Sequence, residues 1–253
     1  MAEKIVAGNW KMHLQLDEAY DLFAGITDAS TQLPNDVRVL VIPPFPFIHP
    51  LYRELPPSSS IDIGAQNCHQ EEAGAFTGEV SPPMLASVGA THCIVGHSER
   101  RRDLGESDEL LLEKVRLLLN RDLIPILCLG ESLEERESGK AEDRIRQQLE
   151  KSLLPLSDEE LEQCVLAYEP IWAIGTGHTA SPDQAQEMHA FIRSVLRHRL
   201  GEDRAAGISI LYGGSCKAAN AEALFAQKDI DGGLIGSASL QVEAFLSIIR
   251  SFP

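Results

Sequence analysis

A carboxylate stands directly behind an apolar run in the segment AYEPIWAIGTG, residues 167–177. The run over residues 164–168 is typical of a buried strand, and Glu169 follows it, with Pro170 and a glycine-terminated loop behind. An acid placed at the end of a buried strand can carry general acid/base chemistry. A surface carboxylate at a strand exit is the ordinary alternative, and the proline and tryptophan that follow Glu169 argue against it.

Other polar residues also follow apolar runs along the chain. They are Asn9, Lys11, Gln66, Asn67, His97, Ser98, Glu131, Ser215, Gly236 and Ser237. If the runs are parallel strands, their carboxyl ends meet at one rim, where a carboxylate, an imidazole, an amine and an amide would converge. That set suits acid/base work on a small anionic molecule. The glycine-rich ends of the last two runs free backbone N–H groups that could hold a phosphate.

The elements that must position these residues are eight short apolar runs. They cover residues 4–10, 37–44, 61–67, 92–98, 124–130, 164–170, 207–215 and 232–238. Their centres are continuously apolar, as in parallel strands buried on both faces. Eight strands alternating with helices in 253 residues predict a single-domain α/β protein, a (β/α)8 TIM barrel over 1–253. An open doubly wound sheet is the alternative, because periodicity alone does not show closure.

Amphipathic segments between the runs predict the helices. Ala19, Leu22, Phe23 and Ile26 share one helical face, as do Met188, Phe191, Ile192 and Val195. Ser132, Ser157 and Ser181 each begin a capping-box pattern, which predicts three helix starts.

The composition and net charge of the chain restrict the classes of partner and the compartment that we expect for it. The net charge of −16 disfavours nucleic acid and anionic membranes, both of which reward a surplus of Lys and Arg. The five cysteines contain no C-x-x-C pair, which favours a reducing compartment over a disulfide framework or a zinc site. No apolar leader or membrane-length run is present, so we expect a cytoplasmic protein.

Two short motifs match other functions only superficially. Residues 175–180 fit the dinucleotide pattern G-x-G-x-x-A, but they do not begin at a strand end, and the next helix start lies beyond them at Ser181. Residues 96–100 approach the nucleophile-elbow pattern G-x-S-x-G, but Arg100 replaces the last glycine. We therefore reject both.

Four motifs together resemble the triosephosphate isomerase family: GNWKM (8–12), GHSERR (96–101), YEPIWAIGTG (168–177) and LYGGS (211–215). The resemblance extends over essentially the whole chain. It implies a homodimeric barrel enzyme that interconverts dihydroxyacetone phosphate and D-glyceraldehyde 3-phosphate without cofactor or metal. It also implies a place in glycolysis, gluconeogenesis and the pentose phosphate pathway.

The resemblance assigns catalytic roles to Glu169, His97, Lys11 and Asn9. Glu169 would be the base that moves a proton between two carbons, and His97 would polarise the carbonyl as a neutral imidazole. A helix start aimed at the ring would keep it neutral, and the nearest predicted start is at Ser107. Lys11 would meet the developing oxyanion and the phosphate, and Asn9 would donate its amide. Each residue also has an ordinary structural alternative.

The phosphate would be bound by backbone N–H groups of Gly175, Ser215, Gly236 and Ser237, as the resemblance implies. The family usually has Gly-Gly where this chain has Gly236-Ser237. A positive φ at Ser237 would cost ~1 kcal/mol. We therefore expect a negative φ there, with the phosphate contact kept.

The same resemblance implies supporting roles for Ser98, for Glu99 as an ion-paired acid, and for Thr77. Thr77 lies in a long connection, residues 66–82, that resembles the family's dimer loop and would reach the partner's site near Asn9 and Lys11. Residues 169–177 would form a lid that carries the base.

Two rival functions remain to be weighed. A metal-dependent epimerase on a phosphorylated sugar would need a carboxylate/histidine ligand set, which we cannot assemble. A catalytically idle phosphate-binding or protein-binding barrel should have lost Lys11, His97 or Glu169, and all three are present.

Overall fold

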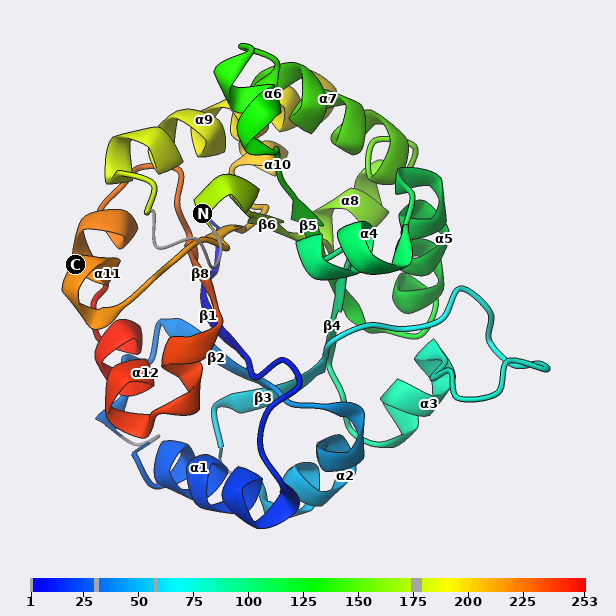
Figure 1. The fold of residues 1–253 in the computed structure, drawn as a ribbon, viewed down its shortest axis with the longest axis vertical. Coiled ribbons are helices and arrows are strands. Elements are labelled where there is room, and N and C mark those ends of the chain that lie inside the picture. The colour runs from blue at the N-terminus through cyan, green and yellow to red at the C-terminus, as the bar shows by residue number, and fades with distance from the viewer. Residues whose placement is uncertain (1, 30–31, 57–58, 174–178) are drawn as a thin grey trace.

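Eight parallel strands close into a barrel in chain order, with β1 beside β8 (Figure 1). The computed structural model describes residues 2–29, 32–56, 59–173 and 179–253. The strands are β1 (Lys4–Asn9), β2 (Val37–Ile42), β3 (Ile61–Ala65), β4 (His92–Val95), β5 (Ile124–Leu129), β6 (Val165–Tyr168), β7 (Ile210–Tyr212) and β8 (Gly232–Ile235). Closure confirms the (β/α)8 barrel and excludes the open sheet.

The strands are shorter than the apolar runs that predicted them. The run over 92–98 becomes β4, which ends at Val95, and the run over 207–215 becomes β7, which begins only at Ile210. Parallel pairing stops where the chain turns out of the barrel. The polar residues at the ends of the runs therefore lie in the loops, as the rim argument requires.

The core has two layers, and successive strand residues alternate between them. Ile5 and Ala7 pack inside the barrel with residues such as Leu40 and Ile126, whereas Val6 packs outward against the helices. A strand that is buried on both faces loses the usual polar alternation. This is why the strands appear in the sequence as continuous apolar runs.

Closure between β1 and β8 requires a glycine. Ile5 is in register with Gly232, whose φ is +143°. A Cβ at residue 232 would lie 1.8 Å from the carbonyl oxygen of Ile5, so no other residue fits there without moving the strand.

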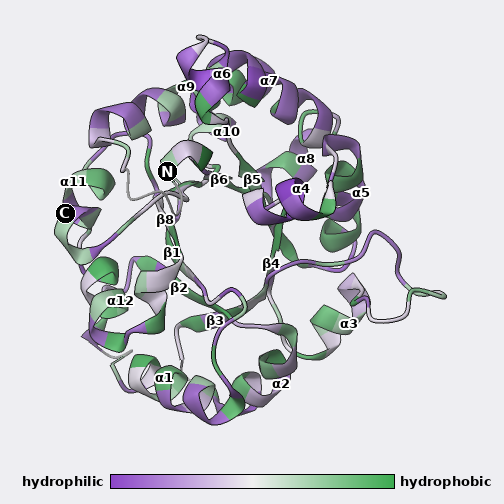
Figure 2. Ribbon diagram, in the orientation of Figure 1, coloured by the Kyte–Doolittle hydropathy of each residue, from purple (hydrophilic) through white to green (hydrophobic). Residues whose placement is uncertain are grey.

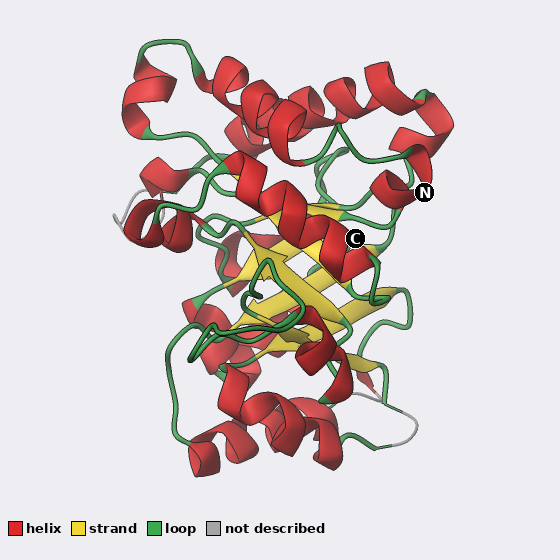
Figure 3. Cartoon of the chain, turned by 90° about the vertical axis from the view of Figure 1, so that its right-hand side faces the viewer, coloured by secondary structure: helices red, strands yellow, loops and turns green. Residues whose placement is uncertain are grey.

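Helices surround the barrel, with apolar residues toward the strands and polar residues outward (Figures 2 and 3). They are α1 (Leu16–Asp28), α2 (Phe45–Glu54), α3 (Pro82–Ser87), α4 (Ser98–Leu104), α5 (Asp108–Leu119), α6 (Leu133–Glu137), α7 (Ala141–Ser152), α8 (Asp158–Glu162), α9 (Pro182–Leu200), α10 (Glu202–Ala205), α11 (Ala218–Phe225) and α12 (Val242–Ile249), with short 3-10 turns η2 (Ile171–Ala173) and η3 (Ser237–Leu240). None of the helices in the described ranges is long and apolar enough to cross a membrane.

The predicted helix signals are confirmed. The four residues on the predicted face of α1 are all buried. The capping boxes at Ser132, Ser157 and Ser181 are all formed, and they begin α6, α8 and α9. On α9 the predicted face is buried except at Phe191, which is half-buried and lies against the guanidinium of Arg146 at 5.0 Å.

The connection over residues 66–82 projects from the body between β3 and α3 (Figure 1). The His69 N–H donates to the carbonyl oxygen of Val80 at 2.8 Å, which closes the base of the loop. Nearer the tip, the ring of Phe76 packs on the ring of His69 with centroids 4.3 Å apart, yet Phe76 stays 42% exposed. The loop thus presents an aromatic side chain to its surroundings.

Candidate active site

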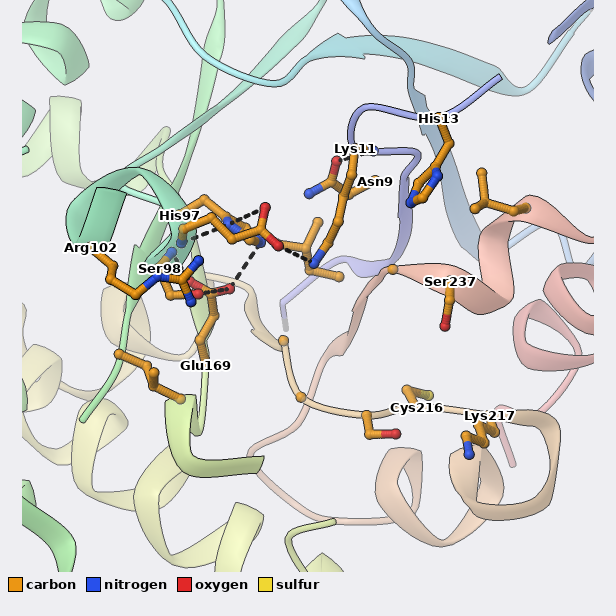
Figure 4. Close-up of a pocket in the computed structure, with 18 residues that line it drawn as sticks. Asn9, Lys11, His13, His97, Ser98, Arg102, Glu169, Cys216, Lys217 and Ser237 are labelled. Atoms are coloured by element: carbon orange, nitrogen blue, oxygen red, sulfur yellow. Dashed lines mark hydrogen bonds and ion pairs between the residues drawn. The ribbon is translucent and has the colours of Figure 1, made fainter. Parts of the chain in front are cut away.

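A cavity of about 510 Å³ opens at the carboxyl ends of the strands (Figure 4). We refer to it as the pocket. Of the predicted site residues that the structure describes, all except Thr77 line it. Gly175 and the end of the predicted lid, residues 174–177, lie outside the described residues. Thr77 is exposed on the projecting loop and does not line the pocket.

Glu169 is the first residue after β6 and is only 2% exposed. Its N–H donates to the carbonyl oxygen of Leu129 at 2.7 Å, so its backbone continues the barrel pairing. Two glycines leave room for it. A Cβ at Gly130 would lie 2.2 Å from the Glu169 carbonyl oxygen, and one at Gly213 would lie 2.9 Å from the Glu169 Cγ. Neighbouring strands therefore position this carboxylate.

The Glu169 carboxylate accepts hydrogen bonds from two adjacent residues. The Ser98 N–H donates to Oε2 at 2.8 Å, and the Ser98 hydroxyl donates to Oε1 at 3.2 Å. His97 Nε2 lies 3.1 Å from the same Oε1. Residues 71 positions apart in the chain thus meet directly.

The two ring nitrogens of His97 have different partners. His97 is the N-cap of α4, and the Glu99 N–H donates to its Nδ1 at 3.3 Å. Because Nδ1 accepts this bond, Nε2 is the ring nitrogen left to donate, and it lies 3.1 Å from Glu169 Oε1. An Nε2–H that faces the pocket can donate to a carbonyl oxygen.

The helix start that acts on His97 differs from the predicted one. A helix does begin behind Ser107, which caps α5, but the helix that contacts the ring is α4, capped by His97 itself. The signals for α4 were present in the sequence: an acid, Glu99, in its first turn, and Gly105 in the left-handed conformation just after its end. Seven residues were too few to show a hydrophobic period.

Lys11 is held in a strained conformation at the pocket rim. Its φ is +51°, unusual for a residue with a side chain. Its N–H donates to Asn9 Oδ1 at 3.0 Å, and its carbonyl oxygen accepts from Gln66 Nε2 at 2.8 Å. These bonds hold the backbone so that the ammonium points into the pocket.

Glu99 is ion-paired, as predicted. Its Oε1 lies 2.7 Å from the Lys11 ammonium. Burial opposes ionisation, but Lys11 and His97 outweigh it and hold the pKa of Glu99 below its usual range. In this structure Glu99 orients the ammonium.

The predicted phosphate side is formed by the ends of β7 and β8. Ser215 and Gly236 line the pocket, and Ser237 begins η3. Among the described residues other than glycine, a positive φ occurs at Lys11, Leu14 and Asp122 only. Ser237 is not one of these, so it has the negative φ that we predicted. Its Cβ therefore causes no backbone strain.

Glu131 lies at the end of β5 and ties the start of the predicted lid to the barrel. It is fully buried, and its Oε1 accepts from Tyr168 at 2.9 Å and from Trp172 Nε1 at 2.8 Å. Arg136 adds a third donor at 3.1 Å, and its guanidinium lies 4.9 Å from the Trp172 ring centre. Burial raises the pKa of Glu131, opposed by these donors. The sequence indicated Glu131 as a rim residue but not this role.

Besides two leucines, four further residues line the pocket and were not predicted: His13, Arg102, Cys216 and Lys217. Arg102 binds Asp103 through two contacts of 2.6 and 2.8 Å. Burial raises the pKa of Cys216 to about 12, so its thiol stays protonated near neutral pH. Within the described ranges, no three His, Cys, Asp or Glu side chains are grouped as metal ligands would be.

Comparison with known proteins gives one consistent result. The family model described as Triosephosphate isomerase matches residues 4–252. A triosephosphate isomerase of Bacteroides fragilis is 51% identical over 255 residues, covering all of both chains. One of Porphyromonas gingivalis is 48% identical over 252 residues, also with full coverage, and one of Alkalilimnicola ehrlichii is 48% identical with 99% of each chain covered.

Proposed function

The chain belongs to the triosephosphate isomerase family and is an isomerase, and from this we propose that it interconverts dihydroxyacetone phosphate and D-glyceraldehyde 3-phosphate through an enediol(ate). The observation that carries the proposal is the convergence of Glu169, His97, Lys11 and Asn9 on one pocket. A base, a neutral proton donor, a cation and an amide are the groups this proton transfer needs.

In the proposed reaction Glu169 removes a proton from one of the two carbons next to the forming enediol and returns it to the other. His97 Nε2–H donates to the carbonyl oxygen where negative charge develops, assisted by the Lys11 ammonium and the Asn9 amide. A neutral imidazole suits this role because its Nε2–H can donate a hydrogen bond to the charged oxygen without transferring the proton completely.

In the proposed reaction, substrate binding rearranges the contact between His97 and Glu169. The Nε2–H of His97 now points at Glu169 Oε1, 3.1 Å away. A substrate carbonyl would replace that carboxylate as the acceptor, and Glu169 would turn toward the substrate carbon. On turning it would lose the Ser98 donors, which lie at 2.8 and 3.2 Å. A carboxylate with fewer donors is a stronger base, so the supporting role of Ser98 is to hold the base until substrate arrives.

The phosphate group would be bound on the opposite side, by the backbone N–H groups of Ser215, Gly236 and Ser237. Gly175, outside the described residues, would add a fourth donor as the lid covers the substrate. Lid residues 171–173 already form the turn η2, anchored through Trp172 to Glu131. The anchored end would act as the fixed side of a hinged lid.

We also propose that the protein is a homodimer joined by the loop over residues 66–82. The exposed Phe76 near the loop tip supports this, because an aromatic side chain there gains by burial in a partner. Thr77 would then support the partner's Lys11 and Asn9. A cytoplasmic place in glycolysis, gluconeogenesis and the pentose phosphate pathway follows from the proposed reaction, with no resident cofactor or metal.

The experiment that tests the reaction is a coupled assay of triose-phosphate interconversion on the wild type and Glu169→Gln. The amide cannot accept the carbon-bound proton, so we expect kcat to fall by about 10³-fold. Glu150→Gln, which changes an exposed glutamate on α7, is the matched control and should keep full activity. Full activity in Glu169→Gln would refute the mechanism.

A further inference from the structure

The lysine and arginine side chains that line the pocket differ in whether their charge is already balanced. Lys11 pairs with Glu99 at 2.7 Å, and Arg102 pairs with Asp103 at 2.6 Å. Lys217 is exposed and forms no ion pair with any residue that the structure describes. Its positive charge is therefore available to an anion that enters the pocket.

The side chain of Asn220 helps to hold the turn that carries Lys217. Asn220 Oδ1 accepts from the Lys217 N–H at 2.7 Å, and Asn220 Nδ2 donates to the Ser215 carbonyl oxygen at 3.0 Å. Asn220 thus couples the backbone at Ser215, one of the proposed phosphate donors, to the base of the Lys217 side chain. In Figure 4, Lys217 and Ser237 lie on the side of the pocket opposite His97 and Glu169.

We propose that Lys217 is a further phosphate-recognition residue, which contacts the phosphate dianion of the substrate from the mouth of the pocket. The proposal rests on the proposed function and extends its phosphate subsite from backbone donors to a side-chain charge. The backbone N–H groups bind the anion from inside. The flexible Lys217 stem brings a point charge to the solvent-facing oxygens.

The net charge of the chain explains why such a residue would matter. At −16 the whole molecule repels a dianion, and only local positive charge can reverse the field at the pocket. Since Lys11 and Arg102 have carboxylate partners, the unbalanced ammonium of Lys217 makes the larger local contribution to attraction.

The test is the affinity for inorganic phosphate, measured by titration calorimetry on the wild type, Lys217→Met, Lys217→Arg and Lys228→Met. Methionine keeps the length and apolar stem of lysine but removes the charge. We expect Lys217→Met to weaken phosphate binding by about three- to tenfold and Lys217→Arg to change it by less than about twofold. Lys228 is also exposed but follows the far end of α11, so Lys228→Met controls for net charge.

A parallel kinetic readout separates recognition from catalysis. Lys217→Met should raise KM for dihydroxyacetone phosphate by the same factor while kcat stays within about twofold, and the KM difference should shrink at high salt. Equal phosphate affinity in Lys217→Met and Lys228→Met would overturn the proposal. Phosphate binding does not depend on turnover, so a wild type that binds phosphate but isomerises nothing would refute the reaction, not the role of Lys217.

Discussion

At the scale of single residues, the site depends on how the His97 ring is held between two glutamates. The Glu99 N–H donates to its Nδ1, and its Nε2 lies 3.1 Å from Glu169 Oε1. A protonated ring would carry hydrogens on both nitrogens and would lose the contact with the Glu99 N–H. The first turn of α4 therefore favours a ring that donates through Nε2, which is the form that the proposed reaction uses.

Replacing His97 by glutamine tests that role. The glutamine amide can still donate, but from a longer side chain that the α4 N-cap contact no longer orients. We expect kcat to fall by about 10²-fold with a smaller change in KM, measured in the coupled assay. His198→Gln, on the exposed face of α9, should leave kcat unchanged. A kcat within about threefold of wild type in His97→Gln would contradict the electrophile role.

At the scale of elements, two loops extend from strand ends and differ in how they are held. The start of the proposed lid is anchored behind β5 through Glu131, which binds Tyr168 and Trp172 on one oxygen. The loop over 66–82 is held at its base and by Arg121, which pairs with Glu72 at 2.7 Å, and its tip projects away from the barrel (Figure 1). The first arrangement suits a hinge, and the second suits insertion into a partner.

A charge at Phe76 should weaken the proposed dimer. Burying an unpaired carboxylate in a partner's surface is costly, so Phe76→Asp should raise the dimer dissociation constant by at least about tenfold. Sedimentation velocity over a dilution series measures this directly. Leu133→Asp, at another exposed apolar position on α6, is the matched control. A wild type that sediments as a fully active monomer would remove the dimer proposal.

At the scale of the whole molecule, two histidines of the described residues are buried away from the pocket, in addition to His97. His92 is 1% exposed, with its Nδ1 2.8 Å from the Thr91 hydroxyl, and His189 is fully buried, with its Nδ1 3.2 Å from the Asp229 carbonyl oxygen. Burial lowers the pKa of each to about 3, from an ordinary value of 6.5. Both rings are therefore neutral in the folded protein at neutral pH.

This predicts a loss of stability as pH falls from 6.5 toward about 3. In that pH window the two histidines bind protons in the unfolded chain but stay neutral in the folded protein. This lowers the free energy of unfolding by up to about 4 kcal/mol per histidine. The free energy of unfolding, measured by urea at fixed protein concentration, should fall less steeply below pH 6 in His189→Asn than in the wild type. The expected difference in slope is about 1 kcal/mol per pH unit. His49→Asn, at an exposed position on α2, should keep the wild-type slope, and an unchanged slope in His189→Asn would contradict the prediction.

Much of the fold was predictable because local patterns and tertiary packing agree. Strands buried on both faces appear as apolar runs, and the serine at the start of α6, α8 and α9 forms the capping box that its spacing predicts. The helix α4 was missed because a helix of seven residues carries too little pattern, whereas the predicted start at Ser107 is the start of α5. Lys217 was missed for a different reason, since nothing in its neighbourhood distinguishes it from a solvated lysine.

By itself, the sequence indicated eight buried strands that alternate with helices, and polar residues at most of the strand exits, because these follow from short-range periodicity and from the motifs around Glu169 and His97. Only the tertiary structure decided the closure of the barrel and its strand order, the direction of the Glu169 carboxylate, the contacts of the two His97 ring nitrogens and the ion pair of Lys11 with Glu99. It also decided which pocket-lining cation, Lys217, has no ion-pair partner among the described residues. These features depend on contacts between residues far apart in the chain, such as Ser98 with Glu169, 71 positions away. Such contacts arise only when closure of the barrel brings the strand ends together.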